Sequence, residues 1–108
     1  MTIAVLGAGA FGTALAIALS REDQPVGLWA RDRDHAQSMA AARVNTRRLP
    51  GVPIPENVTI SAEIVDFSSE TVLLLAIPMQ QLAGFVQQHS ALLAGKALVV
   101  CAKGIDLA

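Results

Sequence analysis

The stretch TIAVLGAGAFG at residues 2–12 decides the fold: an apolar run leads directly into a turn rich in glycine. The segment Thr2–Gly7 is apolar and rich in β-branched residues, which predicts a buried strand. From Ala10 to Arg21 the sequence becomes rich in Ala and Leu, which predicts a helix. The opening of the chain therefore predicts a strand, a tight glycine turn and a helix.

The turn matches the pattern G-x-G-x-x-G, and each of its glycines has its own task. Gly7 permits the tight turn, Gly9 lets a pyrophosphate approach the backbone, and Gly12 lets the helix pack closely on the strand. Amides at the start of the helix then bind phosphates, helped by the positive end of the helix dipole. Such turns also arise for structural reasons alone, but the position between a strand and a helix favours a ligand. We therefore predict that a dinucleotide binds to Gly7, Ala8, Gly9, Ala10, Phe11 and Gly12.

The rest of the chain alternates short apolar runs with helical segments. Strands are predicted over Val26–Ala30, Val58–Ser61, Thr71–Ile77 and Lys96–Ala102. Helices are predicted after Asp32 as far as Arg43 and over Met79–Leu93, with a short acidic turn or helix over Ala62–Phe67. This alternation predicts right-handed crossovers between parallel strands. The predicted fold class is α/β, a Rossmann-type doubly wound, mostly parallel sheet with helices on both faces.

The segment NTRRLPGVPIPEN at residues 45–57 interrupts the alternation. Pro50, Pro53 and Pro55 lack the backbone donor, so neither a regular helix nor a central strand is compatible with this segment. We predict a long, stiffened connection.

The composition sets the class of protein. A chain of 108 residues is long enough for one domain, and with 53% hydrophobic but only 4% aromatic residues its core must be mainly aliphatic. The net charge of −1 is spread along the chain, which gives no reason to expect nucleic acid or an anionic membrane as a partner. Glycines interrupt the apolar first nineteen residues and no basic residue precedes Arg21, so we expect neither a signal peptide nor a membrane span. The expected compartment is the cytoplasm.

The residues after the second predicted strand bear on the choice of cofactor. Asp32 lies about 20 positions beyond the glycine motif, where an acidic residue binds the adenosine ribose of NAD. Arg31 and Arg33 flank it and would suit the 2′-phosphate of NADP. Alternatively, Asp32 only caps a helix and the arginines belong to a solvated turn. NAD and NADP both remain candidates.

Cysteine, histidine and two further arginine residues are the other candidates for chemistry. Cys101, the only cysteine, lies in an apolar run and is predicted to be a small core residue rather than a nucleophile. His35 and His89 have no partner at a ligand-like spacing, so no metal site is expected. Arg47 and Arg48 either face a phosphate or are solvated loop charges.

Five segments together resemble bacterial glycerol-3-phosphate dehydrogenases of the NAD(P) type. They are GAGAFGTALA at 7–16, LWARD at 28–32, NTRRLPGVPIPENV at 45–58, AIP at 76–78 and AKGID at 102–106. The resemblance spans essentially the whole chain. It implies reversible hydride transfer between NAD(P)H and the pair dihydroxyacetone phosphate and sn-glycerol 3-phosphate, a step toward glycerophospholipid precursors.

The resemblance also implies roles for individual residues. Ala10 and Phe11 fall at cofactor-contacting positions, and Arg31 falls where the family contacts the adenosine end. Lys103 falls at a lysine beside nicotinamide and substrate, which implies catalytic, cofactor-binding and substrate-binding roles. An ammonium group there stabilises a carbonyl oxygen or a phosphate. The alternative is an exposed lysine before Gly104. Ala10 departs from relatives that often carry Ser or Asn, which removes a side-chain hydrogen bond to the cofactor.

The resembling enzymes have two domains, and their helical C-terminal domain carries further catalytic and phosphate-binding residues. Residues 1–108 correspond to the NAD(P)-binding domain and end soon after a predicted strand, so we expect a fragment that does not transfer hydride alone. The parent is expected to be a homodimer acting on a small phosphate ester. Two alternatives stay open, namely another two-domain dehydrogenase of hydroxy-acid or ketopantoate type, and a non-catalytic NAD(P)-sensing module.

Overall fold

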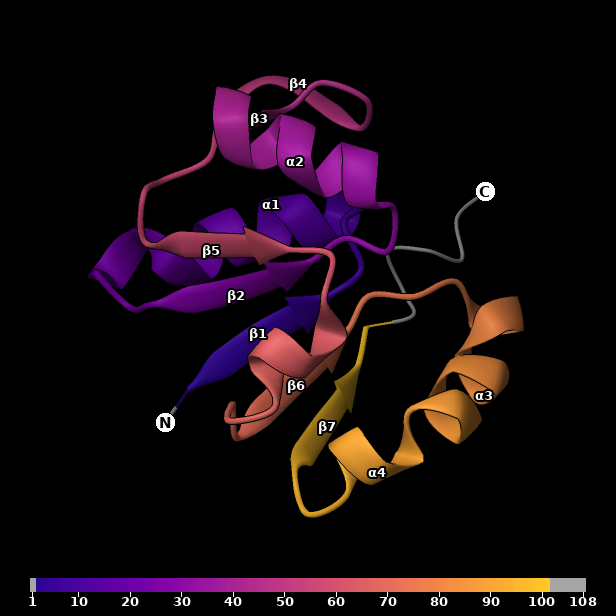
Figure 1. Cartoon of the computed structure of the whole chain (residues 1–108). Helices are drawn as coiled ribbons and strands as arrows, with labels where there is room; N and C mark the ends of the chain where they lie inside the picture. The colour runs from indigo at the N-terminus through magenta and orange to yellow at the C-terminus, as the bar shows by residue number, and fades with distance from the viewer. Residues whose placement is uncertain (1, 102–108) are drawn as a thin grey trace.

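A computed structural model describes residues 2–101 and shows a sheet of five strands, all paired in parallel (Figure 1). The strands are β1 (Ile3–Leu6), β2 (Val26–Trp29), β5 (Val58–Ser61), β6 (Val72–Leu75) and β7 (Ala97–Val100). Their order is β5-β2-β1-β6-β7, so the chain starts at the centre, builds to one edge and then crosses to the other side. This order is that of a Rossmann-type sheet, which confirms the predicted fold class.

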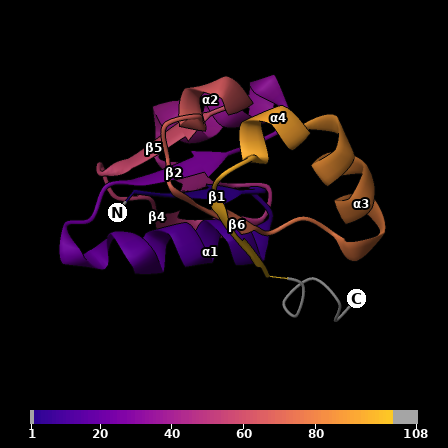
Figure 2. The same ribbon diagram turned by 90° about the horizontal axis from the view of Figure 1, so that it is seen from below.

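Helices cover both faces of the sheet. α1 (Ala10–Leu19) and α2 (Arg33–Ala42) pack on one face, where Ala16, Ile17 and Met39 join a core cluster. The other face is covered by the 3₁₀ helix η2 (Ile64–Phe67), α3 (Met79–Gln88) and α4 (Ser90–Leu93). Figure 2 shows α1 and α4 on opposite sides of the sheet.

The core is built around the central strand β1. Val5 belongs to the cluster under α1, whereas Ala4 and Leu6 belong to the cluster on the opposite face, and all three are fully buried. This alternation explains why the strand is continuously apolar, since both of its faces are covered. In the adjacent strand, a Cβ on Gly27 would lie 2.5 Å from the ring of Phe67, so this glycine makes room for the aromatic side chain.

Two predicted helices end differently from the prediction. The first helix ends at Leu19 and continues as the short 3₁₀ helix η1 (Ser20–Glu22). The helix predicted over Met79–Leu93 is divided into α3 and α4, with His89 ending one and starting the other. The break allows Leu93 to be buried in the cluster against which Phe85 also packs.

The proline-rich connection contains more regular structure than predicted. β3 (Val44–Asn45) and β4 (Leu49–Pro53) form an antiparallel pair outside the main sheet. The prediction that this segment forms no central strand is confirmed, and the predicted stiffened connection contains a short antiparallel pair that the prediction did not include. A short ribbon with free edges tolerates proline because its backbone donors are not all needed for pairing.

The prediction that Cys101 is a core residue is also wrong. Cys101 follows β7 rather than lying within it, and it is only partly buried. β7 is the edge strand, and its residues Leu98, Val99 and Val100 are themselves exposed. Between residues 2 and 101, no helix is both long enough and apolar enough to cross a lipid bilayer.

Candidate dinucleotide-binding site

Two glycines of the loop after β1 are required by the packing of the protein itself. Gly7 has φ +124°, and a Cβ added there would lie 2.2 Å from the carbonyl oxygen of Ala76. A Cβ added to Gly12 would lie 1.9 Å from the carbonyl oxygen of Gly7. Both distances are far below any tolerated contact, so these positions admit no side chain. The tasks predicted for Gly7 and Gly12, a tight turn and close helix packing, are confirmed.

Gly9 has no such internal reason to be glycine. Its φ of −75° suits any residue, and no atom lies within 4 Å of where its Cβ would be. The open space beside it belongs to a cavity that Gly9 helps to line. A side chain at this position would extend into the cavity, so glycine leaves that space open for a ligand.

The start of α1 offers backbone donors to this space. Gly9 is the N-cap residue, and its backbone carbonyl accepts the first hydrogen bond of the helix from the amide of Thr13 at 3.0 Å. The amides of the first turn of a helix have no intrahelical partners, and no side chain caps them in α1. The helix dipole adds positive potential at the same end. This geometry suits an anionic group such as a phosphate.

The cavity has a volume of about 910 Å³ and opens at the carboxyl ends of the strands. In parallel α/β sheets, ligands bind at the carboxyl ends of the strands, at the point where the strand order reverses. In this sheet that point lies between β1 and β6. All six predicted loop residues and Arg31 line it, whereas Lys103 lies outside the described residues. The complete lining is Gly7, Ala8, Gly9, Ala10, Phe11, Gly12, Trp29, Ala30, Arg31, His35, Arg48, Ala62, Glu63, Ile64, Ala76, Ile77, Pro78, Gln81, Gly84, Phe85, Gln88 and His89.

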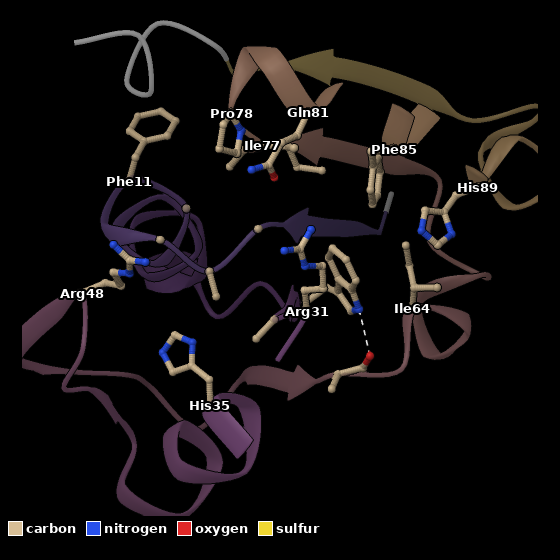
Figure 3. A pocket seen from close by; sticks show the side chains of 18 of the residues that line it. Phe11, Arg31, His35, Arg48, Ile64, Ile77, Pro78, Gln81, Phe85 and His89 are labelled. Atoms are coloured by element: carbon tan, nitrogen blue, oxygen red, sulfur yellow. Dashed lines mark hydrogen bonds between the residues drawn. The ribbon is translucent and has the colours of Figure 1, made fainter. Parts of the chain in front are cut away.

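One end of the cavity is basic. Figure 3 shows Arg48 and His35 on the side of the cavity where α1 starts, with Phe11 above them and Arg31 between this side and Phe85. Arg48 comes from the loop after β3, Arg31 from the end of β2 and His35 from the first turn of α2. Of the two arginines in question, Arg48 lines the cavity and Arg47 does not.

The other end of the cavity is aromatic. The ring of Phe85 lies 5.5 Å from that of Trp29 and 4.6 Å from that of His89, measured between centroids. The Trp29 indole donates to the carbonyl of Ala62 at 3.0 Å, which fixes the orientation of the ring. Ile64 completes this end (Figure 3). Such a surface suits a flat, mostly apolar group such as a nucleobase.

Asp32 does not line the cavity, because its carboxylate has other partners. One oxygen accepts from the amides of Asp34 at 2.9 Å and His35 at 3.3 Å, which caps α2 as the alternative interpretation held. The other oxygen lies 3.1 Å from the guanidinium of Arg47. The hydrogen bond from Arg47 and those from the two amides lower the pKa of Asp32.

The two arginines that flank Asp32 lie in different places. Arg31 lines the cavity, but Arg33 forms an exposed ion pair with Glu63 and lies outside it. Because α2 begins at Arg33, its side chain projects from the helix toward β5 and not back toward the glycine loop.

Sequence reasoning missed a buried polar residue behind the loop. Asn45 is fully buried, and its side-chain amide donates to the carbonyl of Ala8 at 3.0 Å and to the hydroxyl of Thr13 at 2.8 Å. Its carbonyl oxygen contacts the amide of Arg48 at 3.1 Å and Nε2 of His35 at 2.8 Å. The only available signal was the position of Asn45 at the head of the proline-rich segment.

Metal-ligand clusters and the thiol were the other candidate sources of chemistry within residues 2–101. No group of three His, Cys, Asp or Glu side chains within residues 2–101 is arranged to hold a metal ion. His35 and His89 line opposite ends of the cavity (Figure 3). Burial raises the pKa of the Cys101 thiol, which disfavours the nucleophilic thiolate.

Similarity to known proteins agrees with this geometry. Residues 2–108 match the family described as NAD-dependent glycerol-3-phosphate dehydrogenase N-terminus. The chain is 52% identical over 107 residues to a glycerol-3-phosphate dehydrogenase (NAD(P)+) of Ruegeria sp. (strain TM1040), covering 99% of this chain and 33% of the relative. The corresponding enzyme of Roseobacter denitrificans is 50% identical, with the same coverage of both chains.

A solved structure shows the same fold. The crystal structure of glycerol-3-phosphate dehydrogenase from Coxiella burnetii matches with a TM-score of 0.85 and 34% identity, over 95% of this chain and 34% of that one. The chain thus spans about a third of the length of the relatives that it matches. The matched family, the shared fold and the glycine loop agree, and the chain belongs to the family of the N-terminal part of NAD-dependent glycerol-3-phosphate dehydrogenases.

Proposed function

We propose that residues 1–108 are the cofactor-binding domain of an NAD(P)-dependent sn-glycerol-3-phosphate dehydrogenase. The parent enzyme would transfer hydride reversibly between NAD(P)H and dihydroxyacetone phosphate and so supply a glycerophospholipid precursor. The observation that carries the proposal is Gly9, where the folded chain leaves open space beside the amides of α1. A dinucleotide pyrophosphate suits that space in size and charge.

The cavity suggests which groups meet which part of the cofactor. We assign the pyrophosphate to the loop residues Gly7–Gly12 and the adenosine end to Arg31, with Arg48 as a second cation nearby. The carboxylate of Asp32 is held outside the cavity, so two guanidinium groups and no Asp32 carboxylate would meet the adenosine ribose. This arrangement favours the 2′-phosphate of NADP, while NAD remains a second cofactor of the same site.

For the chemical step we propose a role for Lys103. The bound nicotinamide supplies or accepts the hydride. In the sequence, Lys103 comes shortly after the carboxyl end of β7. The cavity opens at the carboxyl ends of the strands. An ammonium group there would bind the substrate phosphate or stabilise negative charge on the carbonyl oxygen during reduction.

The remaining two thirds of the parent would complete the enzyme. Relatives are about three times as long as this chain. We propose that a helical C-terminal domain binds the phosphate ester and supplies further catalytic residues, that the parent is a homodimer, and that it works in the cytoplasm.

An assay of the full-length protein separates this proposal from its alternatives. NADPH oxidation, followed by absorbance, should depend on dihydroxyacetone phosphate and not on ketopantoate or simple 2-oxo acids. Turnover with one of those acids alone would show a different two-domain dehydrogenase. Binding of NADPH without turnover of any of these substrates would point to a sensing module.

A further inference from the structure

The glycine loop is supported from behind by one side chain that does not line the cavity. Asn45 is the second residue of β3, in the proline-rich connection, yet its amide group reaches the loop after β1 and the first turns of α1. We propose that Asn45 is a positioning residue for the dinucleotide site, holding the Ala8–Gly9 peptide in the orientation that binds pyrophosphate. The inference rests on the proposed function, because it concerns the same cofactor.

The donor side of Asn45 sets the direction of a loop amide. Its Nδ2 donates to the carbonyl oxygen of Ala8 at 3.0 Å. A trans peptide is planar and its C=O and N–H groups point in opposite directions. Holding the Ala8 carbonyl toward Asn45 therefore turns the N–H of Gly9 away from Asn45, on the side of the loop that lines the cavity. This hydrogen bond therefore restrains the orientation of the peptide between Ala8 and Gly9.

The second donor bond ties the same side chain to α1. Nδ2 also donates to the Thr13 hydroxyl at 2.8 Å, and both side chains are fully buried. The side-chain amide of Asn45 thus holds both the glycine loop and α1, whose N-terminus faces the cavity. A fixed distance between them matters for a pyrophosphate that binds amides from both, because binding geometry must be held within a few tenths of an ångström.

The acceptor side of Asn45 orients the basic end of the cavity. Its Oδ1 accepts from the backbone amide of Arg48 at 3.1 Å, so this atom is the carbonyl oxygen of the side chain. The Nε2 of His35, 2.8 Å from the same oxygen, must then be the donor. In the neutral ring, Nδ1 carries no proton and remains an acceptor. Two cavity-lining residues, His35 and Arg48, are therefore held to the amide that holds the glycine loop.

Asn57 provides a matched comparison within the chain. Its Nδ2 also donates two hydrogen bonds, in this case to the backbone carbonyls of Ser20 at 2.8 Å and Gln24 at 2.9 Å. The backbone carbonyl of Asn57 accepts from the amide of Val26 at the start of β2, so Asn57 lies at the opposite end of the sheet from the cavity. A substitution at Asn57 therefore tests the loss of two hydrogen bonds donated by a side-chain amide, at a position away from the cofactor site.

The test uses Asn45→Asp and Asn57→Asp in the full-length protein, with calorimetric titration of NADPH and of 2′-AMP. Asn45→Asp keeps an oxygen for Arg48 and His35 but removes both donor bonds and sets an oxygen against the Ala8 carbonyl. We expect NADPH affinity to fall about tenfold or more, because a directed amide to the pyrophosphate is lost. Affinity for 2′-AMP, which lacks the pyrophosphate, should change less than about twofold. Asn57→Asp should leave both affinities unchanged.

Thr13→Val serves if Asn45→Asp does not fold, because it removes only one partner of the amide. It should weaken NADPH binding by about threefold and leave 2′-AMP binding unchanged. A folded Asn45→Asp variant that binds NADPH as well as Asn57→Asp does, or that loses both ligands equally, would overturn the inference. Failure of the unaltered protein to bind NADPH would instead overturn the proposed function.

Discussion

The guanidinium of Arg47 lies 3.1 Å from the Oδ2 atom of Asp32, while Oδ1 of the same carboxylate caps α2. Both oxygens are therefore engaged outside the cavity. A free carboxylate at the end of the second strand would accept hydrogen bonds from the ribose of NAD and repel the 2′-phosphate of NADP. Within residues 2–101, Arg31 and Arg48 are the arginines that line the cavity, and the Asp32 carboxylate does not face them there.

A first prediction concerns Arg48 and the choice of cofactor. Arg48→Ala should weaken NADPH binding by about tenfold and NADH binding by less than about threefold, because a guanidinium group contributes mainly to the additional phosphate. Calorimetric titration of both nucleotides measures this difference. Arg21→Ala, which removes an equal charge from an exposed position in η1, is the control and should change neither affinity. Equal losses for NADPH and NADH in Arg48→Ala would contradict the assignment.

A second prediction concerns acid stability. The pKa of Asp32 in the folded protein lies below its ordinary value, mainly because of the hydrogen bond from Arg47. A depressed folded pKa stabilises the protein above the unfolded value of about 3.9, and this contribution is lost as the pH falls through the folded pKa. Urea midpoints measured between about pH 6 and pH 2 should therefore fall less steeply for Asp32→Asn than for the unaltered protein.

The cause of that shift can be tested with Arg47→Met. This variant should lose most of the same acid-sensitive contribution, since it removes the main cause of the lowered pKa. A slope in Arg47→Met equal to that of the unaltered protein would mean that the helix cap alone accounts for the effect.

A third prediction concerns Arg43, which stabilises the proline-rich connection. Its guanidinium donates to the carbonyls of Ile54, Pro55 and Val58 and is mostly shielded from solvent. Arg43→Ala should lower the free energy of unfolding by about 2–4 kcal/mol, because buried carbonyls lose charged donors. Urea denaturation of Arg43→Ala and Arg43→Lys measures this, with the lysine variant intermediate. A loss below about 0.5 kcal/mol in Arg43→Ala would show that water replaces these bonds.

A fourth prediction concerns the packing glycine of the loop. Gly12→Ala places a methyl group against a backbone oxygen that cannot move without displacing the loop. It should lower the free energy of unfolding by about 3 kcal/mol or more. Gly84→Ala is a matched control in α3, where a Cβ meets nothing within 4 Å, and it should be neutral or stabilising. Similar melting temperatures for Gly12→Ala and the unaltered protein would refute the close contact.

Local patterns in the sequence were enough to predict the main architecture. The apolar run before Gly7, the glycine spacing and the cap at Asp32 each act over a few neighbouring residues, and the sheet and α2 confirm them. The break at His89 and the incomplete burial of Cys101 depend on which face of the sheet is covered. A single strand or helix pattern does not contain that information.

The cavity was only partly predictable for the same reason. The glycine loop and Arg31 follow from a motif, but Asn45 contacts residues 32 and 37 positions away. The aromatic end joins Trp29 to Phe85, which are distant in sequence and meet only because β2 and α3 end beside the same opening. Contacts of this kind are fixed by the topology of the sheet, so they become visible only in the folded chain.

The central claim is that the space beside Gly9 binds a dinucleotide pyrophosphate. Calorimetric titration of NADPH into the full-length protein and into its Gly9→Ala variant tests this most directly. We predict saturable binding to the unaltered protein and loss of that binding in Gly9→Ala, with an unchanged melting temperature because nothing contacts the added methyl group. No saturable binding of either nicotinamide nucleotide to the unaltered protein, or undiminished binding to a folded Gly9→Ala variant, would contradict it.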